Sequence, residues 1–491
     1  MKSAETARCG RKEGFRQQMN FGEQRNLAEE KRQALFLSQL KECIAEWEEA
    51  LGRRVTYHIT TMGCQMNARD SEKLSGVLAE AGCEETEGED ADILLFNTCT
   101  VRENANEKLY GHLGLVKHLK KEKPGMLIGI CGCMMQEADE VVRIREKYRF
   151  VDLVFGTHNL WKFPELLYAC LAEGRRVIDA SETPDVCRDS MPVRRKVPFK
   201  SGVNIMYGCN NFCTYCIVPY VRGRERSREP GEILREIRRL ADDGVKEVML
   251  LGQNVNSYGK TLEQPVSFAD LLRRVAEVDG IERVRFMTSH PKDLSDDLIQ
   301  AIRETPKVCR HLHLPLQSGS SRILKQMNRR YTKESYLALV DRIRTAIPEI
   351  GLTTDIIVGF PGETEEDFEE TLDVIRRCSF QSAFTFLYSR RTGTPAAAMA
   401  DQVPPDVMAD RMQRLIGLVQ ELASRAADRD LGKTVPVLVE EKDAHAPGSL
   451  TGRLGNNLMV HFPGEESLIG QIVDVELTES RGFYYMGRRR Q

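Results

Sequence analysis

Three cysteines in the middle of the chain have a spacing that suits metal chemistry. They are Cys209, Cys213 and Cys216, in the segment GCNNFCTYC, and no fourth cysteine follows within reach. Three thiolates this close together can hold three irons of a [4Fe–4S] cluster and leave the fourth iron open to another ligand. Ferredoxins use four cysteines per cluster, and structural zinc sites are closed by four ligands. The spacing therefore favours an iron–sulfur cluster with an open iron.

A second set of cysteines is spread over the first third of the chain. Cys64, Cys99 and Cys133 each follow a short apolar run that predicts a strand. Since the carboxyl ends of neighbouring parallel strands face one crevice, the three thiols are expected to converge there. Three unrelated buried cysteines are the alternative, which is weaker because all three stand at the same place in successive strands. Cys131 competes with Cys133, but Cys131 should still lie inside its strand, whereas Cys133 lies beyond Gly132.

The bulk composition limits the class of protein. The chain has 491 residues, 41% of them hydrophobic and 29% charged, with a formal net charge of −3. That charge argues against a generally basic RNA-coating protein, so nucleic-acid contacts must come from local patches or from shape. No run reaches the roughly 18 apolar residues of a membrane span, and the charged N-terminus lacks a secretory segment. We therefore expect a multidomain cytoplasmic protein that does not enter the membrane.

The fourteen cysteines fit a reducing compartment, where disulfides are rare and closely spaced cysteines indicate metal or redox chemistry. Cys43, Cys170 and Cys378 lie in helix-like patterns and are predicted to be small core residues. Cys9 lies in a polar head and Cys187 in a linker. No function is assigned to these five.

Predicted strands and helices alternate in the part of the chain that contains Cys64, Cys99 and Cys133. Strands are predicted over residues 56–64, 91–99, 127–133 and 153–157, each followed by helix-compatible sequence. This alternation is typical of an α/β fold with a doubly wound parallel sheet. Before it, residues 1–26 are polar and expected to be disordered. Residues 27–51 predict an amphipathic helix that ends at Gly52.

A second alternating series would position the central cysteines. It follows a polar linker over residues 181–200, which contains a basic run at 193–200. The six predicted strands are 203–209, 247–254, 283–290, 311–318, 353–360 and 382–389. Six strand–helix units indicate a partial (β/α) barrel, in which active sites form at the carboxyl ends of the strands.

The rhythm changes again after a helix predicted near residues 409–429. Five short strands joined by turns follow, at 435–440, 450–454, 457–462, 471–479 and 482–487. Such a segment forms a small antiparallel β-barrel of a kind often used to grip nucleic acid. The predicted divisions are an N-terminal extension (1–53), an α/β domain (54–180), the linker (181–200), the partial barrel (201–429) and the small β-barrel (430–491).

The central cysteine motif resembles the signature of radical S-adenosylmethionine enzymes, including an aromatic residue before the last cysteine. In that superfamily the open iron chelates the amino and carboxylate groups of S-adenosylmethionine, which is cleaved to an adenosyl radical. The segment LLGQN (250–254) resembles the strand end that binds the methionine amino group, with Gln253 where an acidic residue is often found. The resemblance implies cofactor contacts from Tyr215, Gly252, Gln253, Asn254 and Gln317.

Longer segments resemble the methylthiotransferases, a family within that superfamily. They are TMGCQMN, FNTCTVRENA, CGCMMQ, CIVPYVRGRERSR, FMTSHP, HLHLPLQSGSSRIL and TDIIVGFPGETEEDF, and the similarity runs from Val55 to the C-terminus. The resemblance implies a second [4Fe–4S] cluster on Cys64, Cys99 and Cys133, again with an open iron, where sulfur is held and methylated. It also implies that the C-terminal barrel is the RNA-binding, TRAM-like module of these enzymes.

The wording of the motifs favours the branch that methylthiolates C2 of N6-isopentenyladenosine at position 37 of transfer RNA, using two S-adenosylmethionine molecules. Other targets within the family are threonylcarbamoyl-adenosine in transfer RNA and an aspartate of a ribosomal protein. An iron–sulfur electron carrier with an RNA-binding tail is the alternative from another class, against which the open three-cysteine sites argue. The implied partners are transfer RNA, a reductant such as flavodoxin or ferredoxin, and a sulfur donor.

Basic and aromatic side chains give candidate RNA contacts. Arg222, Arg224, Arg226 and Arg228 alternate after the central cysteines and predict either phosphate binding or ion pairs with Glu225 and Glu229. The candidates in the small barrel are Arg453, Asn456, Asn457, Arg488 to Arg490 and the aromatic residues Phe483, Tyr484 and Tyr485. The aromatic rings could stack on unpaired bases, although core packing fits two of them equally well.

Three histidines lie near predicted strand ends: His290, His311 and His313. A lone histidine on a strand is more often structural than catalytic. None is therefore assigned to catalysis, and no acid–base pair is predicted.

Overall fold

The computed structural model describes residues 29–100, 103–180 and 191–490. Two compact units form: residues 1–196 with 217–224, and residues 197–216 with 225–491. The predicted disordered head, the first half of the linker (181–190), Cys9 and Cys187 lie outside the described residues. Within the described residues, no helix is long and apolar enough to cross a bilayer.

The first unit is built on a six-stranded sheet with strand order β2-β1-β3-β4-β5-β6. The strands are β1 (Thr56–Thr61), β2 (Glu84–Glu85), β3 (Ile93–Thr98), β4 (Leu127–Gly132), β5 (Leu153–Gly156) and β6 (Val177–Asp179). All neighbours pair in parallel. The four predicted strands are present. Strands β2 and β6 were not predicted, and they are short and lie at the two edges of the sheet.

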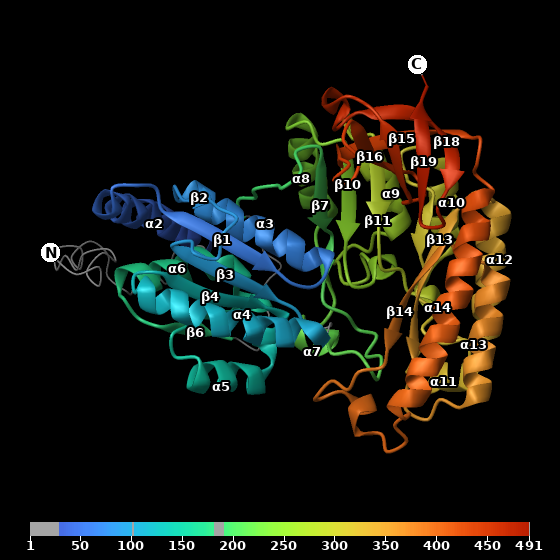
Figure 1. The fold of residues 1–491 in the computed structure, drawn as a ribbon, viewed down its shortest axis with the longest axis horizontal. Coiled ribbons are helices and arrows are strands. Elements are labelled where there is room, and N and C mark those ends of the chain that lie inside the picture. Colours follow the sequence, from blue (N-terminus) through green and yellow to red (C-terminus); the bar gives the residue numbers. More distant parts are fainter. Residues whose placement is uncertain (1–28, 101–102, 181–190, 491) are drawn as a thin grey trace. The chain divides into compact units, whose positions relative to one another are not determined.

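Helices cover both faces of this sheet (Figure 1). They are α2 (Glu29–Leu51), α3 (Gln65–Glu80), α4 (Glu103–Glu122), α5 (Ala138–Lys147) and α6 (Phe163–Ala172). On β3, Ile93 and Leu95 belong to the apolar core shared with α2, α3 and α6, whereas Leu94 and Phe96 belong to the core shared with α4 and α5. Because alternate side chains enter different cores, the sheet is doubly wound, as predicted.

The amphipathic N-terminal helix is confirmed over the part that the structure describes. Helix α2 buries Leu40, Ile44 and Trp47 in the first core, and Cys43 is buried beside them, as predicted. The helix ends before Gly52, whose φ of 65° is the left-handed conformation common after a helix.

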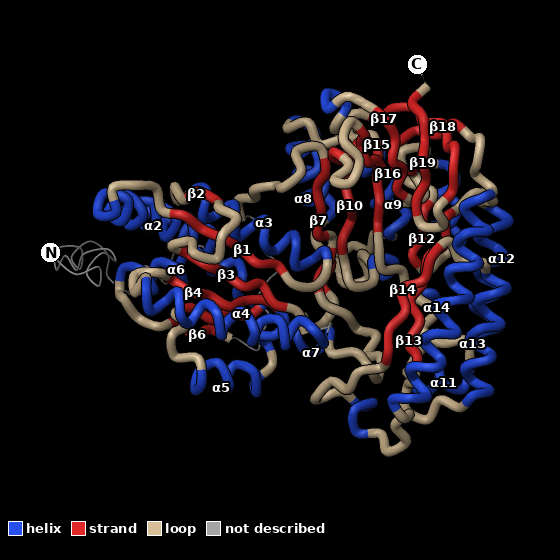
Figure 2. The backbone as a smooth tube through the Cα atoms, viewed as in Figure 1, coloured by secondary structure: helices blue, strands red, loops and turns tan. Residues whose placement is uncertain are grey.

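The second unit contains six parallel strands in two sheets of three. They are β7 (Lys200–Asn204), β10 (Glu247–Leu251), β11 (Arg283–Phe286), β12 (His311–His313), β13 (Gly351–Val358) and β14 (Ser382–Leu387). The sheet orders are β11-β10-β7 and β12-β13-β14, joined between β11 and the segment before β12 by one bridge, Val284 to Val308. Figure 2 shows these strands in red, inside a layer of blue helices. The partial (β/α) barrel is confirmed.

One predicted strand of this barrel is wrong in extent. Instead of a strand over 203–209, β7 begins at Lys200 and ends at Asn204, and the chain then leaves the sheet. Met206–Tyr207 forms β8, which pairs antiparallel with β9 (Arg226–Ser227). The sequence predicts a single strand here because the residues remain largely buried where the chain passes from β7, which pairs with β10, to β8, which pairs with β9.

The helices that cover the partial barrel enclose one apolar core. They are α8 (Pro230–Asp242), α9 (Phe268–Ala276), α10 (Asp296–Glu304), α11 (Ser321–Gln326), α12 (Lys333–Ala346), α13 (Glu365–Cys378) and α14 (Pro405–Asp428). The last begins four residues before its predicted start, since Pro405 occupies the first helical turn, where proline is favoured. Cys378 is buried in this core, and Cys170 in that of the first unit, as predicted.

The C-terminal segment forms a closed five-stranded barrel. Its strands are β15 (Thr434–Lys442), β16 (Ser449–Leu454), β17 (Met459–Pro463), β18 (Ile472–Ser480) and β19 (Tyr484–Arg489). Four of its pairings are antiparallel, as predicted, but β17 and β19 close the barrel in parallel.

The small barrel is bound to the amino ends of the parallel strands through buried charges. Arg283, the first residue of β11, donates to the carbonyl oxygens of Arg453 and Pro436, both at 2.7 Å. Arg285 donates to the Leu454 carbonyl at 2.6 Å and to the Glu247 carboxylate at 2.8 Å. The two domains of this unit are therefore joined by charged hydrogen bonds as well as by apolar contact.

We predict that Arg285→Met destabilises this junction. It leaves the buried carboxylate of Glu247 without its closest cation, which typically costs about 3–5 kcal/mol. Hydrogen exchange of the β15–β19 peptides should report the loss as faster opening. Arg273→Met, which removes partly exposed ion pairs with Asp297 and Asp270, is the control and should cost less than about 1 kcal/mol. Equal effects of the two variants would contradict the prediction.

Candidate metal centres

The scattered cysteines lie at one edge of the first sheet. Cys64 follows β1 and precedes α3, Cys99 follows β3, and Cys133 directly follows β4. Strands β1, β3 and β4 are adjacent, so the three residues extend from neighbouring carboxyl ends. The strand order reverses between β1 and β3, the point at which doubly wound sheets bind ligands.

Glycines allow these strand ends to pack closely. A Cβ at Gly63 would lie 2.7 Å from Sγ of Cys99, and Gly63 has a φ of 110°. A Cβ at Gly132 would lie 2.6 Å from Oδ1 of Asn97, and Gly132 has a φ of 99°. Only glycine meets both demands, so the residue before Cys64 and the residue before Cys133 are fixed by geometry.

The thiols of this set influence one another. Burial raises the pKa of Cys133 to about 12, with further increases from the thiols of Cys64 and Cys99. Cys131, the rival of Cys133, lies inside β4 and is fully buried in the core shared with α2 and α6.

A buried arginine lies against Cys133. Arg222 follows α7 (Val218–Val221), a helix that belongs to the first unit. Its Nε donates to Sγ of Cys133 at 3.2 Å, and its Nη2 donates to Asn67 at 2.6 Å and to Asp70 at 3.1 Å. Burial works to lower the pKa of Arg222, but Cys133 and Asp70 outweigh it and raise the pKa above its usual value.

Two of the alternating arginines pair with carboxylates other than those of Glu225 and Glu229. Arg222 pairs with Asp70, and Arg228 is buried, where it donates to the Asn204 carbonyl at 2.6 Å and to Glu236 at 2.8 Å. Asp70 lies far from Arg222 in the sequence, whereas Glu236 lies eight residues after Arg228, on α8. A run of alternating charges carries no signal of such pairing.

The central cysteines lie in a loop that the segment 326–329 holds in shape. Phe212 has a φ of 46°, and Asn328 donates to the carbonyl oxygens of Asn211 and Phe212 at 3.2 and 2.9 Å. Thr214 donates its N–H to the Met327 carbonyl at 3.1 Å. Backbone groups of the loop thus have partners outside it, which fixes the direction of the cysteines.

The segment 326–329 also brings an arginine into contact with a cysteine thiol. Cys209 and Cys213 are buried, and Cys216 is partly buried. Nη1 of Arg329 donates to Sγ of Cys213 at 3.4 Å, while its Nη2 donates to the Pro315 carbonyl at 3.1 Å. Each cysteine set therefore has one buried guanidinium bonded to one of its sulfurs. Arg329 is not among the residues predicted from the sequence, because a pair of arginines after a helix carries no signal of a contact with a cysteine.

The donor chemistry at both sites fits iron–sulfur clusters. No three histidine, cysteine or acidic side chains of the described residues converge on a point where one metal ion would sit. The cysteines of a cluster bind different irons and surround a volume, so a cluster does not require such a point. A cationic donor on a thiol suits a centre that carries negative charge.

Unpartnered polar atoms gather where S-adenosylmethionine is expected. Gln317, after β12, has a φ of 69°, and its buried Oε1 has no hydrogen-bond partner. Other such atoms belong to residues at or after the carboxyl ends of β7, β10, β11 and β14: Asn204, Asn256, Ser289 and Ser389. Since a buried polar atom without a partner costs free energy, this edge of the barrel is suited to a polar ligand.

The other predicted cofactor contacts have structural partners. Asn254 donates to Asp293 at 2.8 Å and accepts from the His290 N–H at 3.1 Å, so its amide ties two loops together. A Cβ at Gly252 would lie 2.5 Å from Met206, which only glycine avoids. Gln253 is partly buried beside them.

The aromatic residue of the central motif packs in a small apolar cluster. Tyr215 lies against a group that includes Ile323, Met327, Ile357 and Phe360. Burial, then the Cys213 thiol, raises the pKa of Tyr215 well above its usual range. The ring is therefore a neutral apolar surface next to the cysteines.

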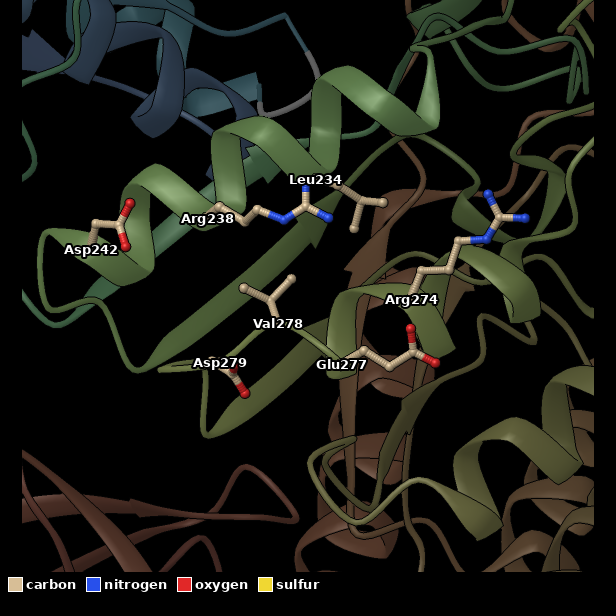
Figure 3. Close-up of a pocket in the computed structure, with 7 residues that line it drawn as sticks. All are labelled: Leu234, Arg238, Asp242, Arg274, Glu277, Val278 and Asp279. Atoms are coloured by element: carbon tan, nitrogen blue, oxygen red, sulfur yellow. The ribbon is translucent and has the colours of Figure 1, made fainter.

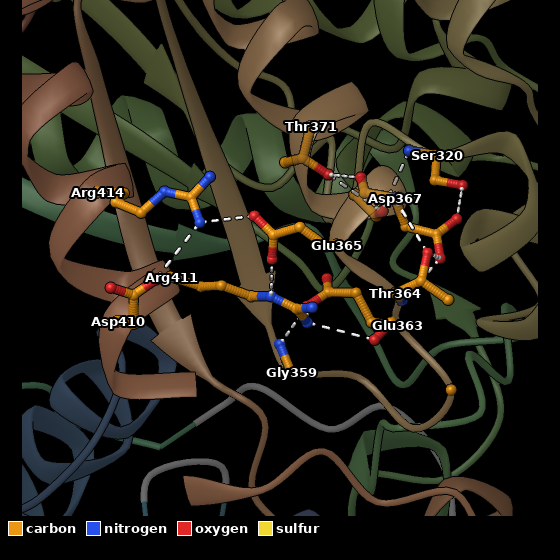
Figure 4. A network of polar contacts seen from close by, with 12 residues as sticks. Ser320, Gly359, Glu363, Thr364, Glu365, Asp367, Thr371, Asp410, Arg411 and Arg414 are labelled. Carbon is orange, nitrogen blue, oxygen red and sulfur yellow. Dashed lines mark hydrogen bonds and ion pairs between the residues drawn. The ribbon is translucent and has the colours of Figure 1, made fainter. Parts of the chain in front are cut away.

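A charged network holds the loop after β13, which supplies Phe360 to that cluster. Glu363 accepts from the Gly359 N–H at 2.8 Å and from Arg411 at 3.0 Å (Figure 4). Burial raises the pKa of Glu363 to about 7. The network connects this loop to α14, so the position of the loop depends on a helix that follows it by more than forty residues.

The surface pocket in Figure 3 is separate from these groups. It is lined by Leu234, Arg238, Asp242, Arg274, Glu277, Val278 and Asp279, from α8, α9 and the residues that follow them. None of the predicted site residues lines it.

Comparisons with known proteins identify the domains and the family of this chain. Residues 56–156 match the model of the uncharacterized protein family UPF0004, residues 203–375 that of the radical SAM superfamily, and residues 428–488 that of the TRAM domain. The chain is 57% identical over 439 residues to the tRNA-2-methylthio-N(6)-dimethylallyladenosine synthase of Lachnoclostridium phytofermentans, covering 89% of this chain and 96% of the relative. The chain belongs to this synthase family. The enzyme of that name from Acetivibrio thermocellus is 54% identical, with 91% and 93% of the two chains covered.

Membership of the family confirms the resemblance predicted from the motifs. As a radical S-adenosylmethionine protein, the chain uses S-adenosylmethionine and [4Fe–4S] clusters. Among solved structures, the radical S-adenosylmethionine methyltransferase TsrM from Kitasatospora setae has a TM-score of 0.51 and 15% identity, with 70% of this chain and 74% of that chain covered. At that identity the likeness concerns the fold alone.

The three histidines have structural partners. His290 accepts from the Lys292 N–H at 3.3 Å and caps a short helical turn. His311 Nε2 and His313 Nδ1 lie 3.1 and 3.0 Å from Oγ1 of Thr353. Burial, reinforced by Arg285, lowers the pKa of His311 to about 3.

We predict that His311 makes the second unit sensitive to acid. An unfolded histidine has a pKa near 6.5 and takes up a proton below it, whereas buried His311 stays neutral, so stability is lost as the pH falls below about 6.5. Between pH 7.5 and 6.0 this amounts to about 0.8 kcal/mol. Thermal unfolding of His311→Gln should show a smaller acid shift than the parent. His445→Gln, at an exposed position, should show no change relative to the parent.

Proposed function

We propose that this protein transfers a methylthio group to C2 of N6-dimethylallyladenosine at position 37 of transfer RNA. One observation carries the proposal: two separate cysteine triads lie at the carboxyl edges of parallel sheets, in a chain that also has a TRAM domain. When bound, two clusters and two S-adenosylmethionine molecules would supply the methylated sulfur and the adenosyl radical that removes hydrogen from C2.

The residues of each site have distinct tasks in this proposal. Cys64, Cys99 and Cys133 would hold the cluster at which sulfur is methylated. Cys209, Cys213 and Cys216 would hold the cluster that binds S-adenosylmethionine. Gln317 Oε1, buried and without a partner, would accept a hydrogen bond from that molecule, and the neutral Tyr215 ring would exclude water beside it.

An aromatic pair on β14 supports the choice of base. The Phe384 ring contacts the His313 ring at 5.8 Å, and Phe386 pairs with Ile357, a member of the cluster against which Tyr215 packs. Both phenylalanines nevertheless remain 51% and 46% exposed. An exposed apolar surface next to the radical site suits a dimethylallyl group and disfavours a carboxylate, such as that of threonylcarbamoyl-adenosine or aspartate.

Fewer residues of the small barrel are candidates for RNA contacts than the sequence indicated. Phe483 and Tyr484 are exposed, whereas Tyr485 is buried and donates to the Ala427 carbonyl at 3.0 Å. Arg453 is bound to Glu440 at 2.9 Å, beside the junction with the parallel strands, and Arg488 is paired with Glu476 at 2.8 Å. The two exposed rings are the best candidates for stacking on unpaired bases.

The proposal requires further partners. Reductive cleavage of S-adenosylmethionine consumes an electron, which a flavodoxin or ferredoxin would supply, and each product carries away one sulfur atom, which a donor must replace. A reducing cytoplasmic location suits both needs, and none of the described cysteines forms a disulfide.

We predict that anaerobic reconstitution loads about eight irons per chain, from two clusters of four. Replacing Cys209, Cys213 and Cys216 together by alanine should remove half of the iron. Cys133→Ala should impair the other cluster, while Cys131→Ala, two residues away in the core, should leave the iron content unchanged. Loss of all iron in the triple variant, or equal losses in the Cys131 and Cys133 variants, would contradict the assignment.

We predict that Phe386→Asn weakens recognition of the modified base. Loss of an apolar contact of this size should lower kcat/KM for transfer RNA carrying dimethylallyladenosine by roughly tenfold or more. Release of 5′-deoxyadenosine without transfer RNA should stay unchanged. Leu387→Asn is a matched control, since Leu387 is also 46% exposed but points to the opposite face of β14. Equal losses in both variants would show that the aromatic face has no special role.

A further inference from the structure

Arg222 has the geometry of a residue that acts on a cluster ligand. Its side chain is buried, and Nε lies 3.2 Å from Sγ of Cys133. Nη2 is held by the Asp70 carboxylate at 3.1 Å and by Oδ1 of Asn67 at 2.6 Å. Asn67 is fixed in turn, because its Nδ2 donates to the carbonyl oxygens of Met62 and Thr98, both at 2.8 Å. The direction of the Nε–H bond is thus set by two side chains and by backbone carbonyls at the ends of β1 and β3.

This arrangement is more than a packing contact. Burying a guanidinium costs free energy unless its charge is paired and its donors are used. Asp70 and Asn67 already bind Nη2 of the Arg222 guanidinium. The other end meets a sulfur atom, a weak acceptor while it is a neutral thiol and a strong one once it carries charge. The site is therefore built for a sulfur that carries negative charge.

We propose that Arg222 sets the reduction potential of the cluster held by Cys64, Cys99 and Cys133 through its hydrogen bond to the Cys133 sulfur. The inference rests on the proposed function, which places a cluster on these cysteines. Hydrogen bonds to cluster sulfurs and net charge are among the factors that set such potentials. Reduction adds one electron to the cluster, so a fixed cation stabilises the reduced form and raises the potential.

Asp70 should act in the opposite direction. Its carboxylate lies next to the guanidinium and offsets part of the positive charge that the cluster experiences. Neutralising Asp70 while Arg222 remains bound to Asn67 should therefore raise the potential, whereas neutralising Arg222 should lower it. Because the two substitutions act on one ion pair, a purely structural role would give no reason for shifts of opposite sign.

The test uses the full-length chain with Cys209, Cys213 and Cys216 replaced by alanine, so that one cluster gives the signal. After anaerobic reconstitution, iron is counted and the midpoint potential is measured by titration with dithionite, followed by electron paramagnetic resonance of the reduced cluster. Arg222→Gln should shift the midpoint to more negative values at unchanged iron content, Arg222→Lys should shift it less, and Asp70→Asn should shift it to more positive values.

Arg329→Gln is the matched control, since Arg329 contacts the cysteine set that is absent from this background. It should leave the midpoint unchanged. If Arg222→Gln fails to take up iron, Arg222→Lys and Asp70→Asn still give a sign. Full iron with an unchanged midpoint in every Arg222 and Asp70 variant would overturn the inference alone. No iron in the parent background would overturn the cluster assignment, and this inference with it.

Discussion

Both cysteine sites depend on the register of parallel strands. In the first unit, Thr61 pairs with Asn97, and Asn97 pairs with Cys131, so the ends of β1, β3 and β4 are level. Cys64, Cys99 and Cys133 follow within a few residues of that line. A slip of one residue would turn every side chain of a strand to the other face and separate the thiols. The site therefore exists only while the whole sheet holds its pairing, which explains why apolar cores on both faces are needed to position three small polar groups.

Buried arginines hold the loops and cysteines at the strand ends in place. Arg222 and Arg329 each bond a cysteine sulfur, Arg411 holds the loop that supports Tyr215, and Arg285 joins the small barrel to the strands. In each case the guanidinium uses several donors at once, and its planar fork leaves little freedom in the groups that it binds. Removal of any one of them leaves an unpaired carboxylate, carbonyl or thiol in a dry environment. These four buried guanidiniums are thus tied to loop ends and junctions.

The place of Cys64, Cys99 and Cys133 at one sheet edge and most strands could be predicted from the sequence, because each strand is an apolar run and each of these three cysteines follows one. The arginine contacts could not: Arg222 and Cys133 are 89 positions apart, and nothing local marks them as partners. The junction with the small barrel is also hidden, since Arg283 and Arg285 bond carbonyl oxygens, which every residue type carries. The parallel pairing of β17 with β19 could not be predicted either, because the order of strands along the sequence does not determine which strands pair to close the barrel.

The position of the small barrel bears on the kind of substrate the second unit can hold. The barrel is bound at the amino ends of the parallel strands, through Arg283, Arg285 and the contact of Lys200 with Glu440 at 2.6 Å. The orphaned polar atoms of Asn204, Asn256, Ser289, Gln317 and Ser389 lie at or after the other ends of these strands. Strand β13 has 8 residues, so the two ends are roughly 25 Å apart at about 3.3 Å per residue. A substrate held by the barrel must extend over that distance to reach the radical site. A folded RNA meets this requirement, and a single side chain of a small peptide does not.

Because the barrel also covers the buried charges at the amino ends, removing it would disturb the strands themselves. Its part in RNA binding is therefore better tested by changing Phe483 and Tyr484 than by truncation.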